Sequence, residues 1–392
     1  MAKNILFLHH NFPGQFKNLA THLDAKNHNI KFLTETNFVG QIGNIDCLNV
    51  EIINGSKNAS LMGQVECGKR YLKALIDLKK SSWVPDIIIS HSGWGCGIFA
   101  KDVFPNSYIV SYSEWWFSRE APEYRYNPNC EWFKFTEKSL SSARLRNLSL
   151  SFELTEADAV VCPTYWQKSQ LPTILQQKTV VIHEGVDVDY FKYNPAWRNN
   201  KTKRITYATR GLEPMRGFPQ FIQALKPIFE EYENIEVVIA AQDKVVYGGS
   251  IPKEGSYWKW AQTILSKEIK LKKVKYLGHL DILDYARLLK SSHLHIYLTR
   301  PFVVSWSLIE AMASGCCIMS NKIEAVQEIV SNDNTLWCDL SNIKTITAAI
   351  RRGLELTDSQ RDSISAKQRS HAVANWNSSD SLSRWMHLLK IG

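Results

Sequence analysis

The residues best suited to chemistry are two arginines and a glutamate in the second half of the chain. Arg210 and Arg216 stand in a loop with two glycines, Gly211 and Gly217, between a predicted strand and a predicted helix. Planar guanidinium groups bind phosphate oxygens bidentately and oppose the negative charge that grows on a leaving group. Two surface arginines in an ordinary loop are the alternative. The pattern predicts a diphosphate site.

Glu310 lies in the stretch LHIYLTRPFVVSWSLIEAMASGCCIM, residues 294–319. This stretch predicts a short buried strand, a turn at Pro301, a helix that carries Glu310, and a second buried strand from Cys316. A carboxylate on a helix that follows a parallel strand points into the crevice where α/β sheets bind ligands. The alternative is an ordinary strand and helix with a surface glutamate.

Three further candidates follow predicted strands in the first half. Gly14 comes after a strand over residues 4–9 and before a helix, so the backbone can approach a ligand and the helix amides favour an anion. A bare turn is the alternative. His91 follows a strand over residues 86–90, at the edge where function concentrates in parallel sheets; a loop contact is the alternative. Glu114, after the next strand, is a further carboxylate at a strand exit.

The elements that must position these residues alternate between strand and helix, which predicts parallel, doubly wound α/β sheets. With 392 residues the chain exceeds one average domain. The polar stretch 194–203 has no hydrophobic period and predicts a boundary near residue 195. We therefore expect an N-terminal domain over 1–194, a C-terminal domain over 195–375 and a terminal helix within 376–392.

Composition indicates anionic partners and a reducing compartment. Lys and Arg number 47 against 38 Asp and Glu, a formal net charge of +9, which suits nucleotide phosphates, an acidic membrane or nucleic acid. The eight cysteines form no Cys-x2-Cys pair and the histidines no cluster at metal spacing, so we expect reduced thiols and no metal. The first strand leaves no room for a signal peptide, and no apolar run approaches the roughly 20 residues that span a bilayer.

Residues 132–146 combine Trp and Phe with Lys134, Lys138, Arg144 and Arg146 in a predicted helical stretch. A basic, aromatic helix face suits an anionic membrane. A solvated helix packed on the sheet is the alternative. We expect a cytoplasmic protein that is held, at most, peripherally at the inner face of the membrane.

The stretch around Glu310 resembles the signature of retaining nucleotide-sugar glycosyltransferases of the GT-B fold, glycosyltransferase family 4. That signature is Glu-x7-Glu followed by Ala-Met-Ala-x-Gly, and residues 310–315, EAMASG, fit its second half. Phe302 stands where the family has its first Glu. In the family the second Glu holds the ribose and the first contacts the transferred sugar. The resemblance therefore carries over the ribose contact, to Glu310, and not the sugar contact.

Four other positions resemble family elements. The segment RGLEPMRG, from Arg210, is similar to the Gly-Arg-Leu-x-x-x-Lys-Gly loop, with Arg216 in place of Lys and one additional residue. The strand that ends before His91 is similar to the family segment with an active-site His. Leu280 lies where the family seats the nucleotide base, and Gly14 lies in the loop that covers the acceptor and donor phosphates.

The resemblance implies two facing Rossmann-like domains and a last helix that crosses back to the first domain. It also implies transfer of a sugar, with retained configuration, from a nucleotide-diphosphate sugar, most often a UDP-sugar, to an acceptor in polysaccharide or glycoconjugate synthesis. The donor is a co-substrate, and no further cofactor is expected. Arg210 and Arg216 would hold the diphosphate, Glu310 the ribose and His91 the sugar, and the other implied donor contacts are Gly14, Leu280, Ser305 and Ser307.

Two alternatives remain open. Phe302 favours a GT-B protein that binds a nucleotide sugar or a partner without turnover. The positive charge favours a glycosyltransferase that modifies nucleic acid, although we do not expect nucleic acid as a partner.

Overall fold

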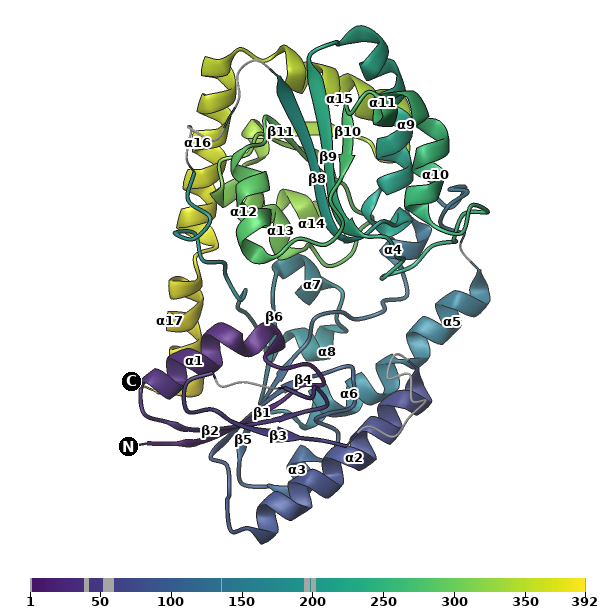
Figure 1. Cartoon of the computed structure of the whole chain (residues 1–392). Helices are drawn as coiled ribbons and strands as arrows, with labels where there is room; N and C mark the ends of the chain where they lie inside the picture. Colours follow the sequence, from purple (N-terminus) through teal and green to yellow (C-terminus); the bar gives the residue numbers. More distant parts are fainter. Residues whose placement is uncertain are drawn as a thin grey trace. The chain divides into compact units, whose positions relative to one another are not determined.

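The computed structural model describes residues 2–38, 42–51, 60–134, 136–193, 198 and 202–391. The chain divides into two compact units (Figure 1). Unit 1 consists of Met1–Ala121, Thr136–Glu184 and Ser378–Gly392, and unit 2 consists of Pro122–Phe135 and Gly185–Asn377. The boundary predicted at residue 195 lies outside the described residues.

The segment Pro122–Phe135, which the sequence placed in the N-terminal domain, belongs to unit 2. Arg300 of unit 2 is only 1% exposed, and it donates from Nε to the carbonyl oxygen of Glu123 across 2.8 Å and from Nη2 to that of Tyr124 across 3.3 Å. The Arg300 guanidinium also lies 4.4 Å from the ring centroid of Phe133. One buried cation thus ties this segment to unit 2.

Unit 1 is built on a seven-stranded sheet with strand order β3-β2-β1-β4-β5-β6-β7, in which all neighbours run parallel. Along β1, Ile5 and Phe7 face one core cluster, and Leu6 and Leu8 face another. Both faces are buried, which explains the continuous apolar runs of the sequence. The strands are β1 (Asn4–Leu8), β2 (Asn29–Thr34), β3 (Asp46–Asn49), β4 (Ile87–His91), β5 (Tyr108–Tyr112), β6 (Ala159–Cys162) and β7 (Thr179–Val181).

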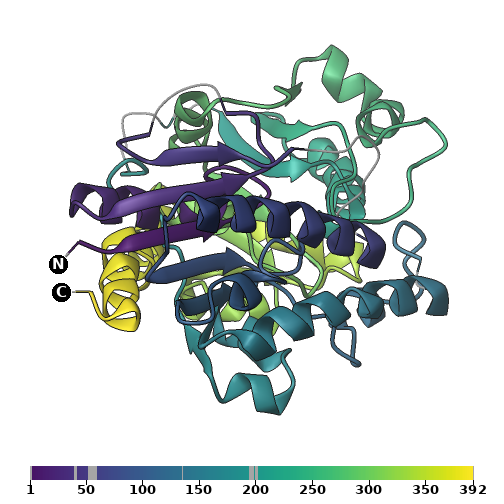
Figure 2. The same cartoon turned by 90° about the horizontal axis from the view of Figure 1, so that it is seen from below.

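Helices cover both faces of this sheet. The terminal helix α17 (Ser378–Leu389) belongs to unit 1 and packs beside α1 (Lys17–Ala25) on one face. The long helix α2 (Leu61–Lys80) covers the other face, and Figure 2 shows it in dark blue along the strands. The remaining helical segments are η1 (Gly14–Phe16), α3 (Ala100–Val103), α5 (Glu137–Leu145), α6 (Asn147–Glu156), α7 (Tyr165–Ser169) and α8 (Thr173–Gln176).

Unit 2 is built on a six-stranded parallel sheet with strand order β10-β9-β8-β11-β12-β13. Its central strand β8 places Ile205 and Tyr207 in one core cluster and Ala208 in another. The strands are β8 (Lys203–Gly211), β9 (Ile235–Gln242), β10 (Val274–Tyr276), β11 (Leu294–Tyr297), β12 (Ile318–Asn321) and β13 (Leu336–Cys338). The described residues thus form two separate parallel α/β sheets, which confirms the predicted fold class.

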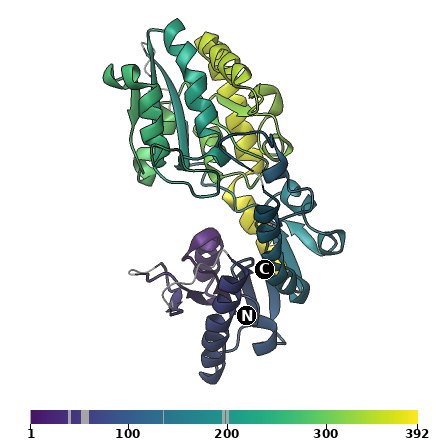
Figure 3. The same ribbon diagram turned by 90° about the vertical axis from the view of Figure 1, so that its right-hand side faces the viewer.

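Helices lie on both faces of the unit 2 sheet (Figure 3). Helix α9 packs against α10 and α15, and α13 packs against α16. The helical segments are α4 (Pro122–Arg125), η3 (Pro214–Arg216), α9 (Phe218–Glu231), α10 (Tyr257–Ile264), α11 (Ser266–Lys270), α12 (Ile282–Lys290), α13 (Trp306–Ala313), α14 (Glu324–Gln327), η4 (Asn332–Asn334), α15 (Ile343–Glu355) and α16 (Asp358–Asn375).

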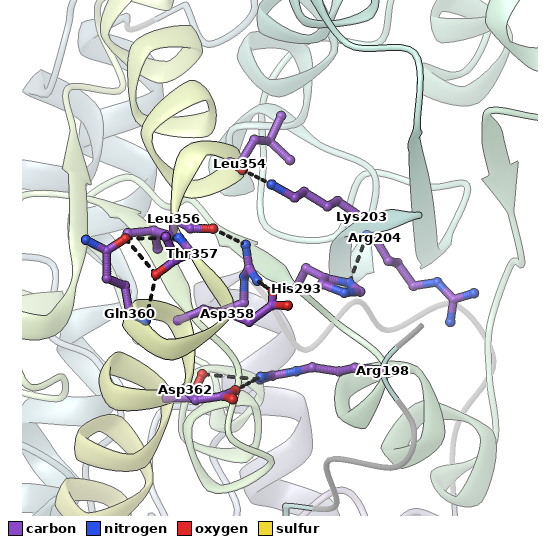
Figure 4. A network of polar contacts seen from close by, with 12 residues as sticks. Arg198, Lys203, Arg204, His293, Leu354, Leu356, Thr357, Asp358, Gln360 and Asp362 are labelled. Carbon is purple, nitrogen blue, oxygen red and sulfur yellow. Dashed lines mark hydrogen bonds and ion pairs between the residues drawn. The ribbon is translucent and has the colours of Figure 1, made fainter. Parts of the chain in front are cut away.

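A polar network joins α16 to the body of unit 2 (Figure 4). Arg198 donates from Nη1 to Asp362 of α16 across 2.7 Å and from Nε to the carbonyl oxygen of Ser292 across 3.2 Å. The amide of Arg204 in β8 donates to Nδ1 of His293 across 3.0 Å. The bonds of Arg198 fix α16, on which α13 packs.

Candidate active site

Arg216 is a buried cation of unit 2, with 4% of its surface exposed. It ends η3, and Gly217 follows with φ of 65°, in the left-handed region that favours glycine. Nη1 of Arg216 donates to Oγ1 of Thr299 across 2.8 Å and to the hydroxyl oxygen of Tyr297 across 3.4 Å. The guanidinium also lies 5.1 Å from the ring centroid of Tyr247. The structure therefore holds this positive charge in one orientation.

Tyr297 connects Arg216 to the start of α13. Its hydroxyl oxygen also accepts a hydrogen bond from the amide of Ser305 across 2.9 Å. Ser305 is the N-cap of α13, and its Oγ accepts from the amide of Ser307 across 3.3 Å and from the Ser307 hydroxyl across 3.1 Å. Two predicted serines and a predicted arginine are thus joined through a tyrosine that the sequence did not single out.

Glu310 lies half-buried on α13. One carboxylate oxygen accepts a hydrogen bond from the hydroxyl of Tyr285, on α12, across 2.9 Å. Burial raises the pKa of Glu310 to about 7, and the hydrogen bond from Tyr285 opposes that rise. The carboxylate therefore changes charge near neutral pH, and it can accept hydrogen bonds from hydroxyl groups of a ligand.

The remaining predicted residues of unit 2 are less closely held. Arg210, near the end of β8, is exposed, and among the described residues it takes no part in the hydrogen bonds that fix Arg216. Leu280 is half-buried and packs against a small apolar cluster on β8, β9 and α12. The structure brings Arg216, Ser305 and Ser307 together, and it places Arg210 at the end of the same strand that leads to Arg216.

Glu213 is a buried residue within the arginine loop that the sequence did not single out. It is fully buried, and its Oε2 accepts from the amides of Val246 and Tyr247, each across 2.7 Å. Burial raises the pKa of Glu213. The carboxylate thereby fixes the loop that brings the Tyr247 ring beside Arg216. In the sequence, the one feature that could have singled out Glu213 is its position between Arg210 and Arg216.

Phe302, at the position of the first family Glu, packs in an apolar cluster. The buried members of this cluster are Cys130, Phe133 and Met215, and the Phe302 ring lies 5.8 Å from that of Tyr247. The segment Pro122–Phe135, through two of these residues, therefore makes an apolar environment for Phe302.

In unit 1 the predicted Gly14 and His91 both adjoin His9, which follows β1. Gly14 has φ of 51°, and a Cβ at Gly14 would lie 2.7 Å from Nε2 of His9. His91 is the last residue of β4 and is 2% exposed, with its ring centroid 4.5 Å from that of His9. Burial, together with the nearby charge of His10, lowers the pKa of His91 to about 3. His91 is therefore neutral at physiological pH.

The prediction of a single basic, aromatic helix face over residues 132–146 is wrong. Phe133 is 4% exposed and belongs to unit 2, because it packs on the Arg300 guanidinium and the Phe302 cluster. Arg146 stacks on the ring of Phe117 at 4.0 Å. The part from Thr136 to Arg146 belongs to unit 1, where Arg144 is exposed.

Solved structures share this fold over the whole chain. Sucrose-phosphate synthase from Thermosynechococcus elongatus matches with a TM-score of 0.77 at 13% identity, covering 100% of this chain and 98% of that one. Anabaena HepE in complex with UDP and glucose matches with a TM-score of 0.70 at 14% identity and 100% coverage of both. A trehalose-6-phosphate synthase, studied for transfer with retention, matches with a TM-score of 0.69 at 14% identity and 99% coverage of both.

Two family models match consecutive parts of the sequence. The glycosyl transferase family 4 group matches residues 52–191, and the glycosyl transferases group 1 matches residues 189–370. The chain is a GT-B glycosyltransferase of the family 4 group. No curated protein matches the glycosyltransferase.

The match to group 1 contains Arg210, Arg216, Leu280 and Glu310 of this glycosyltransferase. Within the part of the chain that the structure describes, no three His, Cys, Asp or Glu side chains gather as ligands for a metal ion. No helix in the described ranges has the length and apolar character needed to cross a membrane. All eight cysteines are free thiols.

Proposed function

We propose that this glycosyltransferase moves a sugar from a UDP-sugar to an acceptor with retention of anomeric configuration. One observation carries the proposal: the bonds of Tyr297 join buried Arg216 to the first residues of the helix that bears Glu310. A cation and helix amides at one edge of a sheet suit a diphosphate. The Anabaena neighbour solved with UDP and glucose supports a uridine donor, and the trehalose-6-phosphate synthase neighbour supports retention.

In this proposal unit 2 holds the nucleotide. Arg216 binds the diphosphate and opposes the charge that develops on the leaving UDP, and exposed Arg210 adds a second cation. The start of α13, with Ser305 and Ser307, contacts the same phosphates. Glu310 accepts hydrogen bonds from the ribose hydroxyls, and Leu280 packs on the base. These cations and amides replace the metal that other nucleotide-sugar enzymes use, and no cofactor beyond the donor is required.

Unit 1 contributes Gly14 and His91. Neutral His91 can accept a hydrogen bond from a sugar hydroxyl. Gly14 has no side chain of its own, so its backbone can approach the ligand closely. We assign to this unit the contacts with the transferred sugar and with an acceptor in polysaccharide or glycoconjugate synthesis. The free thiols are consistent with a reaction in the cytoplasm.

A surface of unit 1 supports contact of the protein with an anionic membrane. Leu145, Leu148 and Phe152 of α5 and α6 are 52%, 57% and 47% exposed. Their spacing places them on one side of the helical segment, near exposed Lys138 and Arg144. Flotation with phosphatidylglycerol vesicles tests this contact: wild type should float, Leu148→Ser with Phe152→Ser should float less, and equal flotation of both would contradict it.

The proposed reaction is tested by donor consumption and product analysis. Purified protein is incubated with UDP-glucose, UDP-galactose or UDP-N-acetylglucosamine and a panel of sugar acceptors, and UDP release is measured. Wild type should release UDP with at least one pair, and Arg216→Ala and Glu310→Ala should release far less. Proton NMR of the product should show the anomeric configuration of the donor. Donor binding without transfer to any acceptor, or an inverted product, would contradict the proposal.

A further inference from the structure

In unit 1, a carboxylate lies near the unpartnered ring nitrogen Nε2 of His91. Nδ1 of His91 lies 3.1 Å from the carbonyl oxygen of Ser92. Because a carbonyl only accepts, Nδ1 carries the hydrogen and Nε2 presents a lone pair. Nε2 is buried and has no hydrogen-bond partner among the described residues. An unpaired buried acceptor costs free energy until a donor reaches it.

A carboxylate close to this nitrogen is a second acceptor. Oε2 of Glu114, just after β5, lies 3.8 Å from Nε2 of His91. This distance exceeds that of a hydrogen bond, and neutral His91 has no hydrogen on Nε2 to donate. The Glu114 side chain is 35% exposed, so its carboxylate can be reached from solvent. Neither Nε2 of His91 nor Oε2 of Glu114 can donate a hydrogen to the other, so a ligand with hydrogen-bond donors would suit both.

A chain of hydrogen bonds orients the other oxygen of Glu114. The amide of Asn11 donates to Nδ1 of His9 across 2.8 Å, so His9 carries its hydrogen on Nε2. Nε2 of His9 donates to Oε1 of Gln15 across 2.8 Å. The amide nitrogen of Gln15 in turn donates to Oε1 of Glu114 across 3.4 Å. A side chain at Gly14 would collide with the His9 ring, so glycine at this position permits the arrangement. Glu114 is thus held with Oε2 toward His91.

We propose that His91, Glu114 and Gln15 form a binding site for two neighbouring hydroxyl groups of a sugar, in which Glu114 determines the hydroxyl arrangement that is accepted. Two acceptors 3.8 Å apart match the two O–H donors of a vicinal diol. An anion is disfavoured because the carboxylate repels it. This inference rests on the proposed function, and it adds a specificity residue that the resemblance does not supply.

The diol belongs to the donor sugar or to the acceptor, and deoxy substrates distinguish the two sources. UDP release is measured for wild type and Glu114→Gln with UDP-glucose and its 3-deoxy, 4-deoxy and 6-deoxy forms, using the best acceptor of the functional assay. The same comparison is made with deoxy forms of that acceptor. Glu120→Gln, an exposed glutamate of the same unit, is the matched control.

Glu114→Gln should lower kcat/KM about 10- to 100-fold, because one acceptor of a charged hydrogen bond becomes a donor. Removal of the bound hydroxyl from the substrate should lower kcat/KM of wild type by a similar factor. It should lower the already reduced kcat/KM of Glu114→Gln only slightly further. Glu120→Gln should react like wild type. If Glu114→Gln keeps wild-type kcat/KM, or if every deoxy loss is as large in the variant as in wild type, the inference fails. Absence of transfer by wild type would instead overturn the proposed function.

Discussion

Nη1 of Arg216 lies 3.4 Å from the hydroxyl oxygen of Tyr297, within a strand-to-loop region that is closed to solvent. The same oxygen accepts the amide hydrogen of Ser305, so the Tyr297 hydroxyl receives two hydrogen bonds and keeps its own hydrogen to donate. Arg216 and the start of α13 therefore cannot move independently. We therefore expect these groups to act as one unit in the proposed phosphate site.

Arg216→Lys should lower kcat about 100-fold or more. Lysine keeps the charge, but its ammonium lacks the planar fork that aligns Arg216 with Thr299 and Tyr297. UDP release by Arg216→Lys and by Arg210→Lys measures the difference, and exposed Arg210 should lose less than about tenfold because solvent screens its charge. Circular dichroism checks that both variants are folded. Equal losses of kcat for the two variants would contradict the larger role that we assign to buried Arg216.

Tyr297→Phe should lower kcat/KM about 5- to 30-fold, since Arg216 and the Ser305 amide each lose an acceptor. The measurement is a double-mutant cycle with Arg216→Lys. If the two residues act as one unit, the double variant should lose much less than the product of the single losses. Independent, multiplicative losses would contradict the connection through Tyr297.

The Michaelis constant for a UDP-sugar should depend on pH through Glu310. Burial raises the pKa of Glu310 to about 7, so the carboxylate that we propose for the ribose contact is present above pH 7 and is lost as pH falls below it. KM should rise about tenfold between pH 8 and pH 6, if only the ionised form binds well. Glu310→Gln should show a higher KM that hardly changes over this range. A wild-type KM that is constant with pH would contradict the assignment.

The strands were predictable because β1 and β4 bury both faces and therefore appear as apolar runs. Helix α16 was not predicted, because its buried face is mostly polar: Arg361, Ser365 and Gln368 are buried there. No hydrophobic period marks such a helix. Strand β13 was missed: only Cys338 of its three residues is buried, and polar residues flank it on both sides.

For the site, the motif around Glu310 located α13 correctly. Tyr285 and Tyr297 could not be recognised, since a tyrosine within an apolar helix or strand has the same sequence pattern as a core residue. The placement of Phe133 in unit 2 depends on its contact with Arg300, far along the chain, and no local pattern encodes that contact. Local sequence patterns identified the candidate site residues that lie within motifs. The side chains that orient those residues could be identified only from the folded structure.

Glu153 of α6 should make stability depend on pH. It is 3% exposed and accepts from the amide of Gly97 across 3.2 Å, and burial raises its pKa to about 8, above the ordinary value of 4.5 for a glutamate. Between these values the folded state holds a proton that the unfolded state has lost. The free energy of unfolding should therefore fall as pH rises from 4.5 to 8, by up to about 1.4 kcal/mol per pH unit.

Urea unfolding at pH 5, 6, 7 and 8 measures this slope in wild type and in Glu153→Gln. Because Gln does not titrate, the difference between the two proteins isolates the contribution of Glu153 from that of other buried acids such as Glu213 and Glu310. The free energy of unfolding of wild type, minus that of Glu153→Gln, should decrease as pH rises and can become negative. A difference that does not change with pH would show that Glu153 is ionised throughout.

Phe302→Glu tests whether the family carboxylate can be restored. Phe302 packs against Met215, Cys130 and Phe133, so a carboxylate there would lose apolar contacts and be partly desolvated. We expect a loss of about 1–3 kcal/mol in stability and no gain in kcat. Phe302→Leu, which keeps an apolar side chain, should cost less than about 1.5 kcal/mol. Thermal unfolding and UDP release are measured for both variants. A stable Phe302→Glu variant with faster transfer would show that the site accepts a second carboxylate. It would also show that the apolar cluster does not require phenylalanine at position 302.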